Sequence, residues 1–331
     1  MKIQLPYLAS QRKKKYNQHL YMRVLSSQIK KHLGKEVEIK GWLHKKRLLG
    51  SLTFINVRDR HGLIQVLIKN KAEVEKLRGL QVGTVLSIKG LVAEEPRAPG
   101  GVELHEPALS IISKVTDQPP IEIDKPLSHK SDNLDTLFDN RVIGLRNLSE
   151  QIIFKTQANV CQAVRAYFEQ NDFVQIHTPK ILAEATEGGA EVFTMDYFDK
   201  TATLAQSPQF YKQIMVGVFE RVYEIAPVYR AEPSATTRHM SEYISIDGEM
   251  GFIELKELEQ FLGGLLNYAV KELWEKHADE LATFGASKPL LSKEIPTITI
   301  EETHELYSKA NKENTTGEKD LRPDEERWIC E

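Results

Sequence analysis

The residues best suited to chemistry lie in one run, from Arg221 to Met250, which predicts a strand, a polar loop and a returning strand. Arg230 and Glu232 share one face of the first strand at period two. Asp247 and Glu249 do the same on the second strand. Charged groups would therefore converge on one sheet face. A lone Arg-x-Glu is typical of a surface ion pair, but here the whole run of thirty residues has to be explained.

A second group of candidates lies upstream of this run. Gln209 and Lys212 are three residues apart, so on a helical turn they share a face, and Lys212 offers a cation to a carboxylate. A neutral amide ligand would have no need of that cation. Glu187 stands beside paired glycines in a loop that could carry its carboxylate onto an ammonium group. The alternatives are a solvated helix face for Lys212 and a polar turn for Glu187.

The elements that must position these residues begin with short strands near the N-terminus. Alternating hydrophobicity and turn residues predict strands at Val37–Leu43, Leu52–Val57, Leu63–Ile68, Val85–Val92 and Val102–Ile112. Five short strands in so short a stretch predict a small closed barrel of the oligonucleotide-binding (OB) type. The exposed face of such a barrel stacks on and pairs with unpaired bases.

The charge of the first fifty residues agrees with that interpretation. The chain has a formal net charge of -3, yet residues 1–50 contain 13 Lys and Arg against 2 acidic residues. Such a segment attracts phosphates through counterion release, although a solvated basic face would have the same composition. Apolar spacings of three and four residues predict an amphipathic helix over 17–33, with a basic outer face.

The second half of the chain predicts a different architecture. We expect a helix at 152–168, strands near 173–177, 201–205, 221–229 and 242–252, and another helix at about 254–274. Antiparallel strand signals mixed with long helices indicate an α+β fold and exclude a doubly wound sheet. No Gly-rich phosphate loop of the Walker or dinucleotide type is present, so nucleotide binding would use other chemistry.

Four segments follow: a basic N-terminal helical extension at 1–34, the barrel at 35–118, a linker or hinge at 119–148, and the second domain at 149–331. The length of 331 residues, 41% of them hydrophobic, is enough for two globular domains. No apolar run could span a membrane and no secretory signal is visible, which predicts a soluble, cytoplasmic protein. Two cysteines, Cys161 and Cys330, predict neither a disulfide framework nor a metal site.

The 221–250 run resembles motif 2 of the class II aminoacyl-tRNA synthetases, in the version of the aspartyl, asparaginyl and lysyl subclass (class IIb). Phe173-Val-Gln-Ile-His-Thr-Pro-Lys-Ile181 resembles motif 1, and the Leu134-Asp-Thr…Asp139-Asn-Arg-Val142 signature precedes it. The resemblance extends from about 36 to 327. It implies an OB-fold anticodon-binding barrel followed by the antiparallel class II synthetase sheet flanked by helices, here incomplete.

The resemblance also implies roles for the charged hairpin. Arg230 would bind the α-phosphate of ATP and the amino-acid carboxylate, and Glu232 would contact the adenylate or the terminal adenosine, which makes these two the catalytic residues. Arg238 and His239 would reach the outer phosphates or the adenine, and Tyr243 would stack on the adenine. The cofactors implied are ATP and Mg²⁺, with the magnesium ligands in a part of the family that this sequence does not contain.

Within the subclass, the sequence resembles the aspartyl enzymes of the archaeal and eukaryotic type. Glu187, Gln209, Lys212 and Asp247 would then bind L-aspartate, Lys212 through its side-chain carboxylate and Asp247 through its ammonium group. Phe54, Gln65 and Glu103 match the positions that stack on and hydrogen-bond the anticodon. Pro179 of motif 1 would lie in a homodimer interface.

The resemblance therefore predicts an aspartate–tRNA ligase that charges tRNA(Asp), with tRNA(Asn) left open because it depends on contacts near His44 and the 96–101 loop. The sequence ends at Glu331, before the family's motif 3, so we expect a truncated chain that binds tRNA with little or no activation activity. Two alternatives stay open: an asparaginyl-tRNA synthetase or asparagine synthetase of the same ancestry, and a non-catalytic tRNA-binding paralogue.

Overall fold

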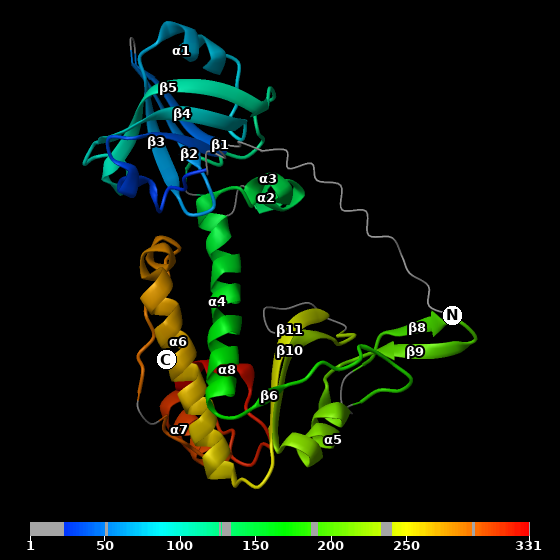
Figure 1. The fold of residues 1–331 in the computed structure, drawn as a ribbon. Coiled ribbons are helices and arrows are strands. Elements are labelled where there is room, and N and C mark those ends of the chain that lie inside the picture. The colour runs from blue at the N-terminus through cyan, green and yellow to red at the C-terminus, as the bar shows by residue number, and fades with distance from the viewer. Residues whose placement is uncertain are drawn as a thin grey trace, which may run out of the picture. The chain divides into compact units, whose positions relative to one another are not determined.

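The computed structural model describes residues 23–49, 52–125, 127, 134–186, 191–232, 240–292 and 295–330. The chain divides into two compact units, Met1–Gln151 and Ile152–Glu331 (Figure 1). The four segments predicted from the sequence, with boundaries at 34, 118 and 148, stay a proposal. Within the described residues, no helix is long and apolar enough to cross a membrane.

The first unit is built on a closed barrel whose strands follow the order β1-β2-β3-β5-β4. These strands are β1 (Glu36–Leu49), β2 (Leu52–Arg58), β3 (Leu63–Ile68), β4 (Val85–Glu94) and β5 (Val102–Ser113). β3 and β5 pair in parallel, whereas the other neighbours pair antiparallel. The predicted strands and the predicted barrel are confirmed.

Strand β1 is longer than predicted, and a bulge explains the difference. Inward-facing residues alternate with outward-facing ones up to Leu43, which lies in the core. The register with β2 then shifts between Leu43 and Lys45, and His44 is buried. Because the extra residue interrupts the period-two pattern, the sequence signal stops there while the strand continues to Leu49.

The helix predicted over 17–33 is wrong for the part that lies within the described residues, since only a short 3₁₀ helix, η1 (Ile29–His32), forms there. Residues 17–22 lie outside the described part. Hydrogen bonds to the barrel take the place of helical ones: Asp59 accepts from the backbone N and Oγ of Ser26 at 2.6 and 2.7 Å, and Val24 N donates to Glu38 O. Burial tends to raise the pKa of Asp59, but these bonds outweigh it and lower that pKa.

Short helices complete the first unit. They are α1 (Lys71–Leu77), the 3₁₀ helix η2 (Pro99–Gly101), α2 (Leu134–Asp139) and α3 (Arg141–Gly144). Helix α1 was not predicted; Asn70 caps it by accepting from Ala72 N at 2.8 Å, and Leu77 anchors it in the barrel core. The α2 and α3 helices lie within the stretch predicted as a linker.

The second unit contains a sheet of strands β11-β10-β6 and a small sheet of strands β7-β9-β8. Its strands are β6 (Val174–Gln175), β7 (Ile181–Leu182), β8 (Thr194–Tyr197), β9 (Lys200–Leu204), β10 (Arg221–Tyr229) and β11 (Glu242–Met250). Its helices are α4 (Leu148–Gln170), α5 (Gln209–Phe219), α6 (Leu255–Thr283), α7 (Ile300–Asn311) and α8 (Pro323–Cys330). Antiparallel β10–β11 pairing beside long helices confirms the α+β class.

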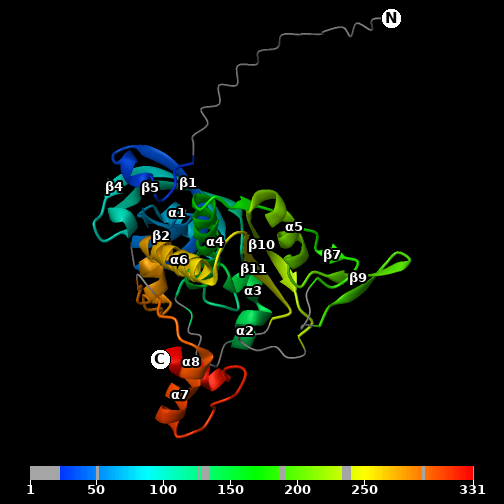
Figure 2. The same cartoon turned by 90° about the horizontal axis from the view of Figure 1, so that it is seen from below.

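Helices α4 and α6 cover one face of the β10–β11 hairpin, and α5 lies over the other (Figure 2). On the α4 side, Phe168 stacks on Tyr223 with ring centroids 4.7 Å apart. Gly248 allows this close approach, because a Cβ at that position would lie 2.9 Å from the Phe168 ring. The sheet is therefore held rigidly from one side, which leaves its other face to carry polar groups.

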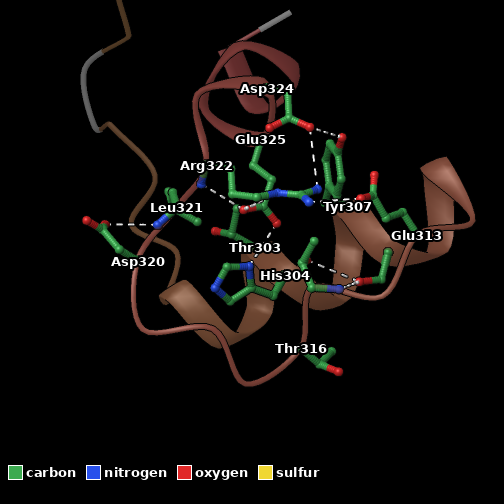
Figure 3. A network of polar contacts seen from close by, with 12 residues as sticks. Thr303, His304, Tyr307, Glu313, Thr316, Asp320, Leu321, Arg322, Asp324 and Glu325 are labelled. Carbon is green, nitrogen blue, oxygen red and sulfur yellow. Dashed lines mark hydrogen bonds and ion pairs between the residues drawn. The ribbon is translucent and has the colours of Figure 1, made fainter.

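Helices α7 and α8 are joined by polar contacts (Figure 3). His304 Nδ1 lies 2.8 Å from Glu325 Oε1, and both side chains are buried. Tyr307 Oη donates to Asp324 Oδ2 at 2.7 Å, and Arg322 N donates to Glu325 Oε2 at 2.9 Å. Burial works to raise the pKa of Glu325, but its hydrogen bonds with the Arg322 backbone and with the Thr315 and His304 side chains lower it to about 2. A negative charge is thus fixed between the two helices.

Candidate functional site

The β10–β11 hairpin presents its polar groups on the face that α5 covers. The register places Glu224 directly opposite Asp247. Side chains two residues apart on β11 share that face: Tyr243, Ser245, Asp247 and Glu249. The alternation predicted from the sequence therefore places both Asp247 and Glu249 where a ligand could meet them.

Lys212 is the buried cation of this face. It lies near the start of α5 and is 6% exposed. Its Nζ lies 3.2 Å from Asp247 Oδ1 and 3.6 Å from Glu249 Oε2, and Ser245 Oγ donates to Asp247 Oδ2 at 2.5 Å. A lysine buried in this way is not a solvated helix face, so that alternative for Lys212 is wrong. Gln209 is half-buried at the first turn of the same helix.

A second lysine and carboxylate lie on the same face, and the sequence analysis did not single them out. The Glu224 carboxylate is 1% exposed and accepts from Thr178 N at 2.7 Å, Thr178 Oγ1 at 2.8 Å and Lys180 Nζ at 2.8 Å. Pro179, the predicted interface residue, lies between these donors and is exposed in the single chain. The donors of the Thr178-Pro179-Lys180 triplet are visible in the sequence, but the local sequence does not show which carboxylate they bind.

Five charged side chains pair with one another on this face. Two lysines and three carboxylates contribute a formal charge of −1: Lys180, Lys212, Glu224, Asp247 and Glu249. Buried charge is costly unless it is paired. A ligand that brings one cationic group to Asp247 and Glu249 would balance this set.

The remaining hairpin candidates lie at the end where the loop joins β10 to β11. Arg230 and Glu232 fall just after β10 instead of on it, because the strand ends at Tyr229; the bond from Arg230 N to Ser241 O, 3.0 Å, continues the pairing by one residue. Both side chains, and that of Tyr243, are half-buried. Arg238, His239 and Glu187 lie outside the described residues.

The barrel candidates share its outer face. Phe54 alternates with the buried Ile55 and is therefore not a core residue. Gln65 Nε2 donates to Glu103 Oε2 at 2.7 Å, and His105 Nε2 lies 2.7 Å from Glu103 Oε1. His105 had not been predicted; it stands two residues after Glu103, on the same face of β5. Beside this group lies a hollow of about 390 Å³, lined by Leu67, Lys69, Asn70, His105, Glu106 and Pro107.

His44 is buried at the bulge in β1. Burial lowers the pKa of its imidazole, and the nearby Arg58 guanidinium lowers it further. On the outer face, the same guanidinium lies 4.8 Å from the centre of the Trp42 ring. Whether His44 bears on the choice of tRNA stays a prediction.

The described residues include no group of three or more His, Cys, Asp or Glu side chains that could hold a metal ion. The hairpin carboxylates are instead paired with lysines.

Known proteins share this architecture. Over 289 residues the chain is 40% identical to "Aspartate--tRNA(Asp/Asn) ligase" of Thermus thermophilus, and over 293 residues it is 40% identical to "Aspartate--tRNA(Asp) ligase" of Pyrococcus horikoshii. Each alignment covers 86% of this chain and 66% of the relative, so the chain spans about two thirds of their length. The crystal structure of asparaginyl-tRNA synthetase from P. horikoshii with asparaginyl-adenylate superposes with a TM-score of 0.84 at 27% identity, covering 93% of this chain and 71% of that one.

Family patterns match both parts of the chain. Residues 37–112 match the OB-fold nucleic acid binding domain. Residues 133–331 match the family described as tRNA synthetases class II (D, K and N). Because this second match covers more than half of the chain, and the barrel precedes it in the sequence, the chain belongs to the class II tRNA synthetases of the D, K and N group.

Proposed function

We propose that the protein is an aspartate–tRNA ligase, which activates L-aspartate with ATP and transfers it to the 3′ end of tRNA(Asp). The observation that carries this proposal is the buried Lys212, held at 3.2 Å from Asp247. The names of the relatives that are 40% identical support it.

Aspartate fits the charges around Lys212. Its ammonium group would lie against Asp247 and Glu249, which share the one cation of Lys212, and its side-chain carboxylate would also share Lys212, whose ammonium has three donors. Asparagine offers Lys212 only a neutral oxygen, and a lysine substrate would place a second cation beside it. A carboxylate substrate therefore gains most from this arrangement, and we propose Gln209 and Glu187 as further residues that would bind it.

The chemistry we propose is a two-step acyl transfer. A carboxylate oxygen of aspartate attacks the α-phosphorus of ATP and pyrophosphate leaves; the ribose hydroxyl at the tRNA end then attacks the adenylate carbonyl and AMP leaves. Arg230 would hold both the α-phosphate and the carboxylate, which brings the reactants together and stabilises the developing charge. Glu232, Arg238, His239 and Tyr243 would hold the adenylate.

The barrel would read the anticodon. Phe54 would supply a half-buried aromatic ring on the outer face for stacking, and Gln65 presents an amide whose orientation is fixed by its bond to Glu103. We assign tRNA(Asp) as the partner, with tRNA(Asn) as a possible second substrate to be tested. Resemblance to the family also supports Mg²⁺ as a cofactor, a homodimer formed around Pro179 and a cytoplasmic location.

An asparaginyl enzyme is the second candidate, because an asparaginyl-tRNA synthetase superposes with a TM-score of 0.84. The test is amino-acid-dependent ATP–pyrophosphate exchange with aspartate, asparagine and lysine, on this chain and on one extended through any reading frame that follows codon 331. Exchange with aspartate alone is expected. Exchange with asparagine would move the assignment to the second candidate, and tRNA binding without exchange in either form would favour a non-catalytic paralogue.

A further inference from the structure

We infer that Lys180 is a positioning residue for the amino-acid site, because it neutralises Glu224 and so leaves Lys212 to Asp247 and to the substrate carboxylate. This inference rests on the proposed function, and nothing in the motif resemblance assigns Lys180 a role. It follows from the register of the hairpin, which sets two acidic side chains side by side.

The first step is the distance between the two carboxylates. Glu224 and Asp247 are directly opposite in an antiparallel pair and share one face. The Cβ atoms of such a pair lie about 4.5 to 5.5 Å apart, and like charges placed there are destabilising. Glu224 is 1% exposed, so water screens this repulsion poorly. Each carboxylate therefore needs its own cation.

The second step is how the lysines are shared out. Lys180 Nζ lies 2.8 Å from Glu224 Oε2, and Lys212 Nζ lies 3.2 Å from Asp247 Oδ1. Without Lys180, Glu224 would keep its hydrogen bonds from Thr178 but would have no cation of its own, and it would compete with Asp247 for the Lys212 cation. Lys212 would then be drawn toward Glu224 and away from the substrate side chain.

The position of Lys180 is itself fixed by the backbone. Lys180 O accepts from Ala205 N at 3.0 Å, and Ala205 O accepts from Tyr229 N at 2.9 Å. The residue is therefore tied to the segment that leads into α5 and to the end of β10. The backbone of Lys180 is therefore held in place, and its ion pair with Glu224 depends on the lysine side chain.

The consequence concerns selectivity more than folding. Aspartate adds a carboxylate that needs Lys212, whereas asparagine does not. Loss of Lys180 should therefore weaken aspartate binding more than asparagine binding. If Lys180 had only a structural role, its loss would weaken the binding of both amino acids equally.

The experiment compares Lys180→Met with the double variant Lys180→Met/Glu224→Gln, in which the opposing charge is also removed. Calorimetric titration of the whole chain with L-aspartate and L-asparagine gives the affinities, and thermal unfolding checks that each variant is folded. Lys155→Met is the matched control, because it removes an exposed lysine–glutamate pair of the same unit, Lys155–Glu280 at 3.3 Å.

Lys180→Met should raise the aspartate Kd about tenfold or more, which corresponds to about 1.4 kcal/mol, with a smaller change for asparagine. The double variant should recover most of the aspartate affinity, and Lys155→Met should change neither. Equal losses for both amino acids, or no recovery in the double variant, would overturn the inference.

A crystal structure of Lys180→Met decides the inference even if the wild-type chain binds no aspartate, an outcome that would count against the proposed function alone. We expect Lys212 Nζ to move from Asp247 toward Glu224. If Lys212 stays on Asp247 in that structure, Lys180 does not control it and the inference fails.

Discussion

Replacing Phe54 by alanine should weaken RNA binding without unfolding the barrel. Phe54 lies on the outer face of β2 and is only half-buried. Fully burying such a side chain contributes about 1.5 to 3 kcal/mol, so we expect this partly exposed one to contribute about 1 kcal/mol to stability. Stacking on a base contributes about 1 to 3 kcal/mol, so the Kd for RNA should rise about 5- to 150-fold.

The next residue provides the control, because it faces the opposite way. Ile55 is 1% exposed and belongs to the barrel core. Ile55→Val should lower the free energy of unfolding by about 0.5 to 1.5 kcal/mol while leaving RNA affinity unchanged. The two substitutions should therefore separate binding from stability at adjacent positions in the sequence.

Fluorescence anisotropy with an anticodon stem-loop of tRNA(Asp) measures the affinity at several salt concentrations, and urea unfolding measures stability. Phe54→Ala removes no charge, so the slope of log K against log salt should not change, whereas Arg47→Ala, which removes a cation opposite Phe54, should reduce it. A Phe54→Ala chain that binds this RNA as tightly as the wild type would refute the assignment of this face.

Three other perturbations follow from the second unit. Lys212→Met leaves the Asp247 and Glu249 carboxylates without their buried cation and should lower the free energy of unfolding by about 3 to 5 kcal/mol. Replacing the exposed neighbour Gln213 by Met should not lower it. Equal free energies of unfolding for the two variants in urea titration would contradict the burial of Lys212. Gly248→Ala should lower that free energy by about 1 to 3 kcal/mol, since its Cβ would lie 2.9 Å from the Phe168 ring; an unchanged urea midpoint would show that the ring moves freely. The pKa of Glu325 is lowered from 4.5 to about 2 in the folded chain, so its stabilising effect is present above pH 4.5 and is lost as the pH falls toward 2; amide exchange of α7 and α8 should rise over that interval and should not do so in Glu325→Gln.

Much of the fold could be predicted because its elements follow local rules. Strand β2 alternates strictly and β4 nearly so, and the pairing of β2 to β5 confirms the predicted strands from Leu52 to Ser113. The sequence analysis failed where a long-range contact changed the local preference. The bulge at His44 interrupts the alternation, so the second half of β1 was not predicted. Near Ser26, hydrogen bonds to Asp59, 33 residues away, form in place of the helix that the apolar spacing predicted.

The candidate site was predicted in part for a similar reason. Period-two spacing was enough to place Asp247 and Glu249 on one face, since it needs only the strand. It did not give the end of β10, because the ladder stops at Tyr229 and leaves Arg230 beyond it. Nor could it identify His105 as the second partner of Glu103, because the spacing gives a shared face without giving a contact.

The two lysine–carboxylate pairs show what local pattern cannot supply. Lys212 and Asp247 are 35 residues apart, and Lys180 and Glu224 are 44 apart, so each cation reaches the sheet from a different segment. The strand pattern places two carboxylates opposite each other, but only the tertiary structure decides which lysine serves which. Among these five side chains there is one carboxylate more than there are lysines, which supports the proposal that Asp247 and Glu249 meet the ammonium group of a substrate. On the inference drawn above, a carboxylate on the substrate side chain would bind there only as long as Lys180 keeps Lys212 available.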